Sequence, residues 1–240
     1  MKNLKRLVLL VFAVCSLSIG AAAQKKSWAD WDKKDVDKML NTSGWSHVQH
    51  DTDTSEMMYQ PTSSPTSGND SRRSSRAASG ATNGVVDVTY GIRFFSARPI
   101  REAYARNILL ANPNIKPAQL QNFVDGDYSQ AIVVAVTYDS TDQRSLGPVR
   151  EAFGSATSEK LKNTVYLERK DGKRIFLDEY ALPEKDGTGA KFVFPRLNEG
   201  HPFFEGNDET LRFYADLGKG VVVTWKFKLA DMMYNGKMEY

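Results

Sequence analysis

The sequence predicts a mainly β fold: an antiparallel β-sandwich with one or two short helices, preceded by a separate N-terminal amphipathic helix. Three observations lead to this fold class. Segments in which apolar and polar residues alternate recur throughout residues 85–240. Short turns containing Gly join most of these segments. Only two stretches within that region have apolar residues at helical spacing. Many short strands joined by tight turns are typical of two packed antiparallel sheets.

Residues 1–23 have the three parts of a secretory signal peptide. A start with two lysines and an arginine is followed by an apolar stretch over residues 7–19 and by three alanines at 21–23. The apolar stretch is shorter than the roughly 20 residues that a membrane-spanning helix needs. We therefore expect an exported protein, periplasmic or extracellular, that begins near Gln24 after processing and has no transmembrane helix.

The charge and cysteine content of the processed chain exclude several function classes. Three of the 32 basic residues and none of the 29 acidic residues lie in residues 1–23, so the two charges balance after processing. A balanced chain lacks the basic footprint of a nucleic-acid-binding protein. The only cysteine, Cys15, also leaves with the signal peptide. We therefore expect no disulfide, no cysteine metal site and no thiol nucleophile, and we identify no cofactor motif.

Residues 24–59 are predicted to form an amphipathic helix and a following loop. Ser27 and Asp30 fit a capping box, and the helix is expected to end near residues 41–44. One face of the helix carries an apolar stripe. Its members are Trp28, Trp31, Val36, Met39 and Leu40. A helix this short is marginal alone, so we expect the stripe to pack on the β domain. The alternative is an unknown protein partner bound through Trp28, Trp31, Met39 and Leu40.

Residues 60–84 are predicted to be a disordered linker between the helix and the β domain. The segment is rich in Ser, Thr, Gly and Arg, and its only apolar side chains are three alanines. Burial of so little apolar surface does not offset the entropy cost of ordering the chain.

The first half of the β domain, residues 85–240, contains strands and the two helical stretches. Strict alternation predicts a half-buried strand over residues 86–94. A helix is expected from Pro99 to about Ala111, and a second short one over residues 117–123. Residues 130–138 are almost entirely apolar, which is typical of a central strand covered on both faces. Residues 139–160 are predicted to be a loop.

Hairpins dominate the second half of the domain. Asp171-Gly172 and Asn235-Gly236 are strong turn signals, and a third turn lies at residues 218–220. The predicted strands are residues 163–169, 174–180, 191–194, 210–217, 221–229, 232–234 and 237–240. In the strand at 221–229, one face is apolar. That face consists of Val221, Val223, Trp225, Phe227 and Leu229.

Several segments together resemble an uncharacterised family of exported bacterial proteins, whose members are labelled as carrying a GWxTD domain. The segments are Trp28–Leu40 with Ser43-Gly44-Trp45, Asp51–Met57, Arg93–Pro99 and Asp231–Tyr240. The resemblance covers nearly the whole processed chain, although Gly44-Trp45 continues as Ser46-His47-Val48 and the literal motif is absent. It implies a bacterial, exported protein and transfers no activity or catalytic residue.

Two clusters are candidates for binding small ligands. His47, His50 and Asp51 are metal-ligand residue types at short spacing, in a segment expected to be a loop. Arg93, Arg98 and Arg101 surround the start of the helix at Pro99, where free backbone N–H groups favour an anion.

The sequence thus favours a non-catalytic interaction or structural module of the bacterial envelope, with an unknown ligand. One alternative is a secreted hydrolase with a loop-built site of acids and His201. No Gly-x-Ser-x-Gly nucleophile motif is present, and no catalytic residue is assigned. A second alternative is a small outer-membrane β-barrel, suggested by Tyr234, Met238 and Tyr240 at alternate positions.

Overall fold

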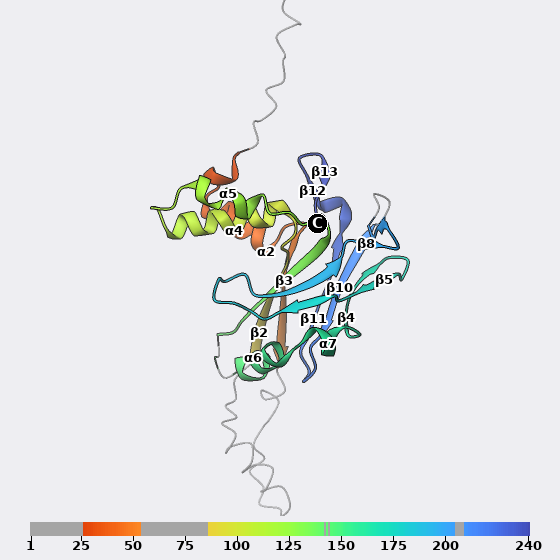
Figure 1. Cartoon of the computed structure of the whole chain (residues 1–240). Coiled ribbons are helices and arrows are strands. Elements are labelled where there is room, and N and C mark those ends of the chain that lie inside the picture. Colours follow the sequence, from red (N-terminus) through yellow and green to blue (C-terminus); the bar gives the residue numbers. More distant parts are fainter. Residues whose placement is uncertain (1–25, 54–85, 142, 144, 205–208) are drawn as a thin grey trace, which may run out of the picture.

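A computed structural model of the chain describes residues 26–53, 86–141, 143, 145–204 and 209–240 (Figure 1). Two antiparallel sheets form its centre. The five-stranded sheet has the order β1-β2-β3-β7-β6 and the four-stranded sheet the order β11-β10-β4-β5. The first comprises β1 (Ser46–Asp53), β2 (Val86–Phe94), β3 (Ala131–Asp139), β7 (Ala190–Pro195) and β6 (Glu179–Ala181). The second comprises β11 (Val222–Lys228), β10 (Thr210–Asp216), β4 (Val165–Arg169) and β5 (Arg174–Phe176).

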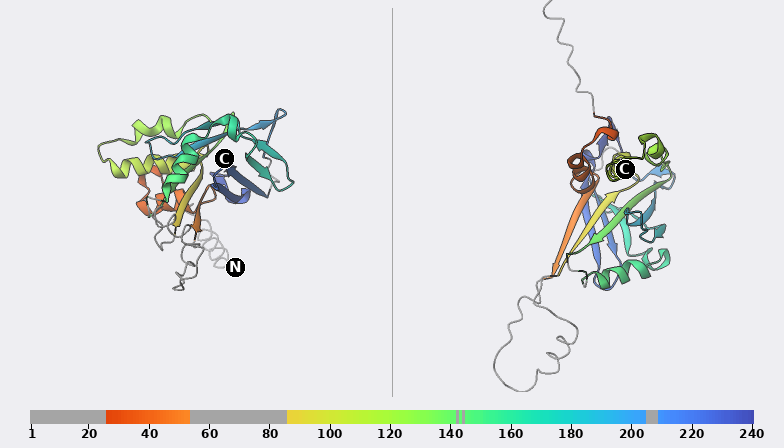
Figure 2. Two further views of the ribbon diagram at one scale, coloured as in Figure 1. Left: turned by 90° about the horizontal axis from the view of Figure 1, so that it is seen from below. Right: turned by 90° about the vertical axis from the view of Figure 1, so that its left-hand side faces the viewer.

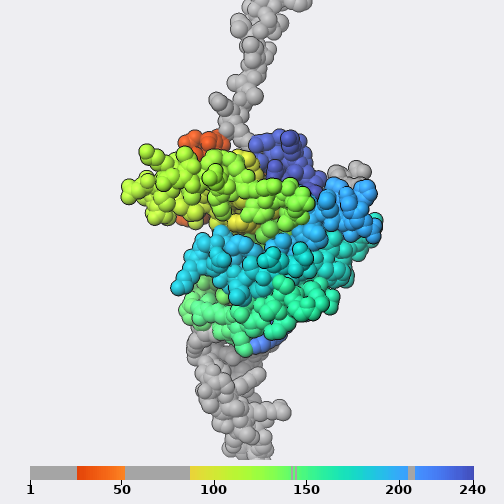
Figure 3. Space-filling view, viewed as in Figure 1, coloured from red at the N-terminus to blue at the C-terminus, as the bar shows by residue number. Residues whose placement is uncertain are grey.

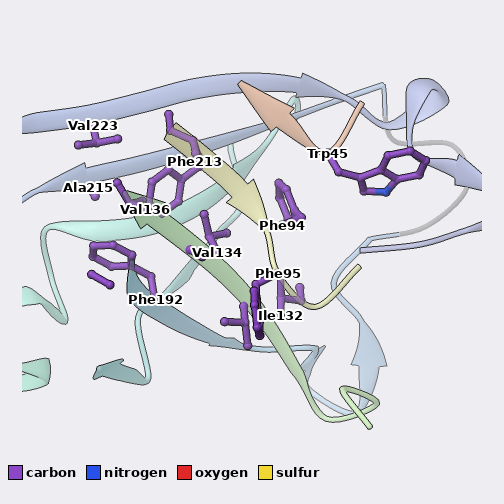
Figure 4. Close-up of a cluster of buried hydrophobic side chains, with 14 of the residues drawn as sticks. Trp45, Phe94, Phe95, Ile132, Val134, Val136, Phe192, Phe213, Ala215 and Val223 are labelled. Atoms are coloured by element: carbon purple, nitrogen blue, oxygen red, sulfur yellow. The ribbon is translucent and has the colours of Figure 1, made fainter. Parts of the chain in front are cut away.

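The apolar faces of the two sheets pack against each other and form the core. Figure 4 shows side chains from β2, β3 and β7 pointing toward those of β10 and β11. Phe213 of β10 makes edge contacts with Phe192 and Phe194 of β7, and Phe94 of β2 meets Phe227 of β11 in the same way. All five rings are buried. The predicted mainly β, antiparallel sandwich-like fold is therefore confirmed.

One group of helices lies together at one end of the sheets (Figure 1). Helix α2 (Lys33–Asn41) packs on α4 (Arg98–Ala111), which in turn contacts α5 (Pro117–Val124). The right-hand view of Figure 2 shows them above the end of β1, β2 and β3. These helices confirm the amphipathic segment and both predicted helical stretches. In the described part of the chain, every helix is too short or too polar to traverse a bilayer.

The N-terminal helix begins later than the sequence predicted. Residues Trp28–Asp30 form only a 3₁₀ turn, and Ser27 makes no capping hydrogen bond with its side chain. The capping box is instead made by Asp32 and Asp35, each of which accepts from the other's backbone N–H. The expected box at Ser27 and Asp30 is therefore wrong, because Asp32 offers the same chemistry one turn closer to the helix.

The segment after this helix was predicted to be a loop, and this is wrong for residues 46–53. They form β1, which pairs with β2 in a register that runs from Ser46 opposite Arg93 to Asp53 opposite Val86. The strands on either side of residues 54–85 are therefore neighbours in one sheet. The predicted linker over residues 60–84 lies outside the described residues.

Residues 139–160 are not a simple loop either. They include α6 (Leu146–Ser155), and α7 (Ser158–Leu161) follows directly. Leu146, Val149 and Phe153 recur at helical spacing in α6 and are buried. Pro148 lies in the first turn of the helix, where its missing N–H costs nothing, so it favours a helix start.

The strand predicted over residues 191–194 is β7, which runs from Ala190 to Pro195. The smaller elements include the predicted terminal hairpin. β12 (Met233–Tyr234) pairs with β13 (Lys237–Met238), and β8 (Leu197–Asn198) pairs with β9 (His201–Pro202). A short 3₁₀ helix, η2 (Leu229–Asp231), follows β11.

Figure 3 shows a hollow between the α4–α5 layer and the cyan segment around β6 and β7.

The sheets are joined at one side by the chain itself. The Leu177 N–H donates to the carbonyl of Val165 in β4, 3.0 Å away, and the Asp178 N–H donates to the carbonyl of Val193 in β7, 2.9 Å away. Two successive residues thus bond to different sheets. The predicted single strand over 174–180 is therefore divided into β5 and β6, one in each sheet.

Candidate functional site at the seam between β1 and β11

At the other side of the sandwich, two edge strands face each other. We call the space between β1 and β11 the seam. Each strand is the last one of its sheet, and within the described chain no backbone pairing joins one to the other. The link is a side chain: Gln49 Nε2 donates to the Val222 carbonyl, 3.0 Å away, and Gln49 Oε1 accepts from the Thr224 N–H, 2.8 Å away. One amide side chain therefore makes hydrogen bonds to two residues of the facing strand.

Beside Gln49, an open cavity of about 300 Å³ lies between the start of β1 and the end of β11. It is lined by Thr42, Ser43, Gly44, Ser46, His47, Trp225, Lys226, Phe227, Lys228 and Asp231. Two of the lining residues meet closely: Gly44 lies directly against the backbone of Asp231. A Cβ atom at position 44 would overlap the Asp231 carbonyl group. Glycine is therefore required there for close approach rather than for an unusual backbone angle.

Trp225 is the exposed aromatic residue of this cavity. It alternates with the buried Val223 and Phe227, as the sequence predicted, yet 40% of its surface is exposed. Its position at the open edge explains the difference, because no neighbouring strand covers it. The ring stacks on His47 of β1, with the two planes 6° apart. The pair thus forms a flat aromatic surface that spans the seam.

The electrostatics of the seam favour neutral histidine and positive charge at the rim. Burial lowers the pKa of His47, and the nearby His50 lowers it further. Lys226 and Lys228 are exposed and make no ion pair with any residue in the described ranges. Lys226 also lies opposite Arg212 in the β10–β11 register. Arg212 already pairs with the Glu168 carboxylate, 3.5 Å away, so the positive charge that an anionic group could neutralise here is that of the two lysines.

The hydroxyl groups of the cavity are engaged in local structure. Ser43 Oγ and Ser46 Oγ lie 2.7 and 2.8 Å from the Met39 carbonyl, to which each donates, and 2.9 Å from each other. These hydrogen bonds connect the end of α2 to the start of β1. A serine nucleophile needs a hydroxyl directed at its base, whereas these point to a backbone carbonyl. The arrangement is suited to binding rather than to nucleophilic chemistry.

The structure does not bring the three metal candidates together. His47 and His50 lie three residues apart on a strand, so their side chains point to opposite faces. His47 meets Trp225, while His50 lies opposite Thr89 on β2. Asp51 is on the face of His47, two residues beyond Gln49. Within the described residues, no three His, Cys, Asp or Glu side chains are placed to hold a metal ion.

The three arginine candidates are each bonded to protein groups. Arg93 donates to the Leu40 carbonyl, the Asn41 side chain and the Thr137 hydroxyl, at 2.6 to 3.0 Å. Arg101 is buried and donates to the carbonyls of Phe95, Ser96 and Val124. Arg98 forms ion pairs with Glu102 and Asp125. The first two arginines fix the helical layer to the sheet, and the three do not converge on one site.

The remaining candidates are also placed. His201 is exposed in β9, opposite Asn198, and buried Phe203 anchors the loop beside it. Of the N-terminal stripe, Trp31 and Leu40 are buried, and Trp28 and Met39 are partly buried against the core. The Arg106 guanidinium donates to the Trp31 carbonyl, 2.5 Å away. The stripe is therefore used within the chain, as expected for docking on the β domain.

Sequence reasoning did not identify Gln49 and did not connect His47 with Trp225. These residues are more than 170 positions apart, and no local pattern records their contact. The one signal in the sequence was Trp225, a large aromatic residue that is followed in its strand by Lys226 and Lys228. Comparison with known proteins adds no relative: the chain matches no family model, no curated protein and no solved structure.

Proposed function

We propose that the protein is an exported, non-catalytic binding module of the bacterial envelope and that it holds its partner at the seam. The observation that carries the proposal is the half-exposed Trp225, stacked on His47 beside a cavity between two sheet edges. Aromatic residues with one open face are enriched where proteins bind partners. A cavity lined by a few polar groups around such a residue is the usual form of a binding site.

The N-terminal sequence supports the export part of the proposal. Residues 1–23 have the organisation of a signal peptide, and the resemblance to exported bacterial proteins agrees with it. Expression in a Gram-negative host followed by fractionation and intact-mass measurement tests this part. We expect a periplasmic or secreted species that lacks residues 1–23. An unprocessed chain that stays in the cytoplasm would contradict export.

The binding part is tested with two defined probe classes, short extended peptides and peptidoglycan oligosaccharides. Tryptophan emission of the processed protein is titrated with each probe. Because the chain has four tryptophans, each titration is repeated with Trp225→Phe. We expect at least one class to change the emission of the natural protein and not that of Trp225→Phe.

The matched control is Phe176→Leu. Phe176 is also an exposed aromatic residue on the same sheet, but it lies on β5, away from the seam. This variant should keep the full response. Absence of a response to both probe classes, or a response that survives in Trp225→Phe, would refute binding at the seam.

A further inference from the structure

We infer that the partner at the seam is an extended peptide with alternating acidic and apolar residues, which adds to β11 as a further strand. This inference rests on the proposed function and specifies its ligand class. It is carried by the backbone of β11, by Gln49 and by the charges at the rim.

The direction of the β11 backbone groups leaves one edge of the strand open. Leu217 donates to the Val221 carbonyl and Leu229 donates to the Glu209 carbonyl, so the odd-numbered residues of β11 bond to β10. The groups of Val222, Thr224, Lys226 and Lys228 consequently point toward the seam. Gln49 bonds to Val222 and Thr224. The N–H and C=O groups of Lys226 and Lys228 face the cavity and form the open part of the edge.

Gln49 shows what kind of group this edge accepts. Its side chain is a primary amide, which has the donor and acceptor of a peptide group. It donates to one β11 residue and accepts from the residue two positions further along. A peptide strand beside β11 makes the same pair of bonds along its own backbone. Gln49 thus makes the hydrogen bonds of one peptide group at the edge of β11. A full strand at this edge would make further bonds of the same kind.

The side chains on the two faces of β11 set the pattern of the incoming strand. Successive side chains of an added strand point to alternate faces. On one face they would lie beside Lys226 and Lys228, where carboxylates would pair with the two exposed ammonium groups. On the other face they would lie against Trp225, which favours small apolar side chains. The matching peptide alternates acidic and apolar residues.

The test is a titration of the processed protein with three blocked heptapeptides, followed by calorimetry and tryptophan emission. The first peptide alternates Glu and Val, the second has the same composition with the four Glu residues grouped, and the third alternates Lys and Val. We expect the alternating acidic peptide to bind at least about tenfold more tightly than either control, which corresponds to a few lost contacts.

Two substitutions at one position separate charge from backbone pairing. Lys226→Gln removes the ammonium group and keeps the N–H, whereas Lys226→Pro removes both. Proline is tolerated because this N–H points away from β10 and the strand lies at an edge. We expect Lys226→Gln to weaken binding about threefold and Lys226→Pro at least about tenfold. Circular dichroism melts identify a proline variant that has lost its fold. In that case a semisynthetic protein, N-methylated at the backbone amide of Lys226, provides the same deletion of the donor.

The outcomes distinguish this inference from the proposed function. Equal affinity for the alternating and grouped peptides, or equal affinity of Lys226→Gln and Lys226→Pro, would refute strand addition. If only an oligosaccharide quenches Trp225, the seam is a binding site and the peptide inference is wrong. If no probe binds, both proposals fail. A stable dimer in sedimentation, lost in Lys226→Pro, would show that the edge pairs with a second copy instead of a peptide.

Discussion

The two sides of the sandwich are joined in different ways. At the β5–β6 side, consecutive residues of one chain segment donate backbone hydrogen bonds to opposite sheets. At the seam, β1 and β11 are held by the side chain of Gln49 and by the close approach of Gly44 to Asp231. The first junction is covalent and continuous. The second is made by separate local contacts, which also include the stacked rings of His47 and Trp225, and an open cavity lies beside them.

This difference separates stability from recognition. The backbone crossover fixes the two sheets to each other through hydrogen bonds of the successive residues Leu177 and Asp178. Two edge strands linked by a side chain leave backbone groups and an aromatic ring exposed. Most proteins protect the edges of their sheets, because exposed backbone groups there can pair with another strand. Substitutions in the shared core, at the seam and at the opposite junction should therefore have different consequences.

Truncation of a side chain in the core between the two sheets should destabilise the whole sandwich. Phe213 is fully buried between the sheets and contacts Phe192 and Phe194. Phe213→Ala is expected to lower the free energy of unfolding by about 3–5 kcal/mol, measured by urea denaturation. Phe176→Ala, in the same sheet but 45% exposed, should cost less than about 1 kcal/mol. Similar losses for the two variants would contradict the position of the core.

A methyl group at Gly44 should open one end of the seam. Its Cβ would overlap the Asp231 carbonyl, so backbone must move in Gly44→Ala. We expect a loss of about 1–3 kcal/mol in chemical denaturation, the usual cost of overpacking. Gly154→Ala is the control: it lies in α6 with open space around it and should be neutral or stabilising by up to about 1 kcal/mol. Equal effects would mean that the strands do not meet at Asp231.

Removal of the Gln49 amide should affect the seam without unfolding the sandwich. Gln49→Ala deletes two hydrogen bonds to β11, each contributing about 0.5–1.5 kcal/mol. Tyr180→Phe, near the opposite junction, deletes one bond from its hydroxyl to the Phe153 carbonyl. We expect faster amide exchange at Thr224 only in Gln49→Ala. Unchanged exchange there would show that Gln49 does not bridge the strands.

Acid should lower the stability of the folded protein slightly, because His47 takes up a proton more easily in the unfolded chain. Its pKa is below the ordinary value of about 6.5 in the folded protein, so the unfolded chain takes up the proton first as the pH falls. Stability from this residue is therefore complete above about pH 6.5 and declines below it. Denaturation curves at pH 7 and pH 5 should differ less in His47→Gln than in the natural protein. An equal pH dependence in the two proteins would show that His47 does not contribute to it.

The sequence was sufficient for elements whose local pattern agrees with their environment. The alternation in residues 86–94 and the Asp171-Gly172 turn predicted β2 and the β4–β5 hairpin, because one face of each strand is buried. β1 was missed because Ser46–Asp53 contains one apolar residue and obtains its place from pairing with β2. α6 was missed because Gly147, Pro148 and Gly154 conceal the helical spacing of its buried residues.

The candidate site was less accessible to sequence reasoning than the fold. Arginines near Pro99 and histidines near residue 50 have the residue types of a site. The arginines, however, are bonded to carbonyls, carboxylates and polar side chains of the protein, and the two histidines point to opposite faces of a strand. The seam depends instead on contacts between β1 and β11, which are distant in sequence. Only a chain already folded into two sheets defines Gln49, His47 and Trp225 as neighbours.

Amide hydrogen exchange measured by NMR along β11 of the processed protein is the most direct test of the open edge. We predict an alternating pattern, in which Trp225 and Phe227, bonded to β10, exchange at least about a hundredfold more slowly than Lys226 and Lys228. Thr224 should be protected by Gln49. Uniform protection of residues 224–228 would show that the edge is already paired, and the seam could not then receive a strand.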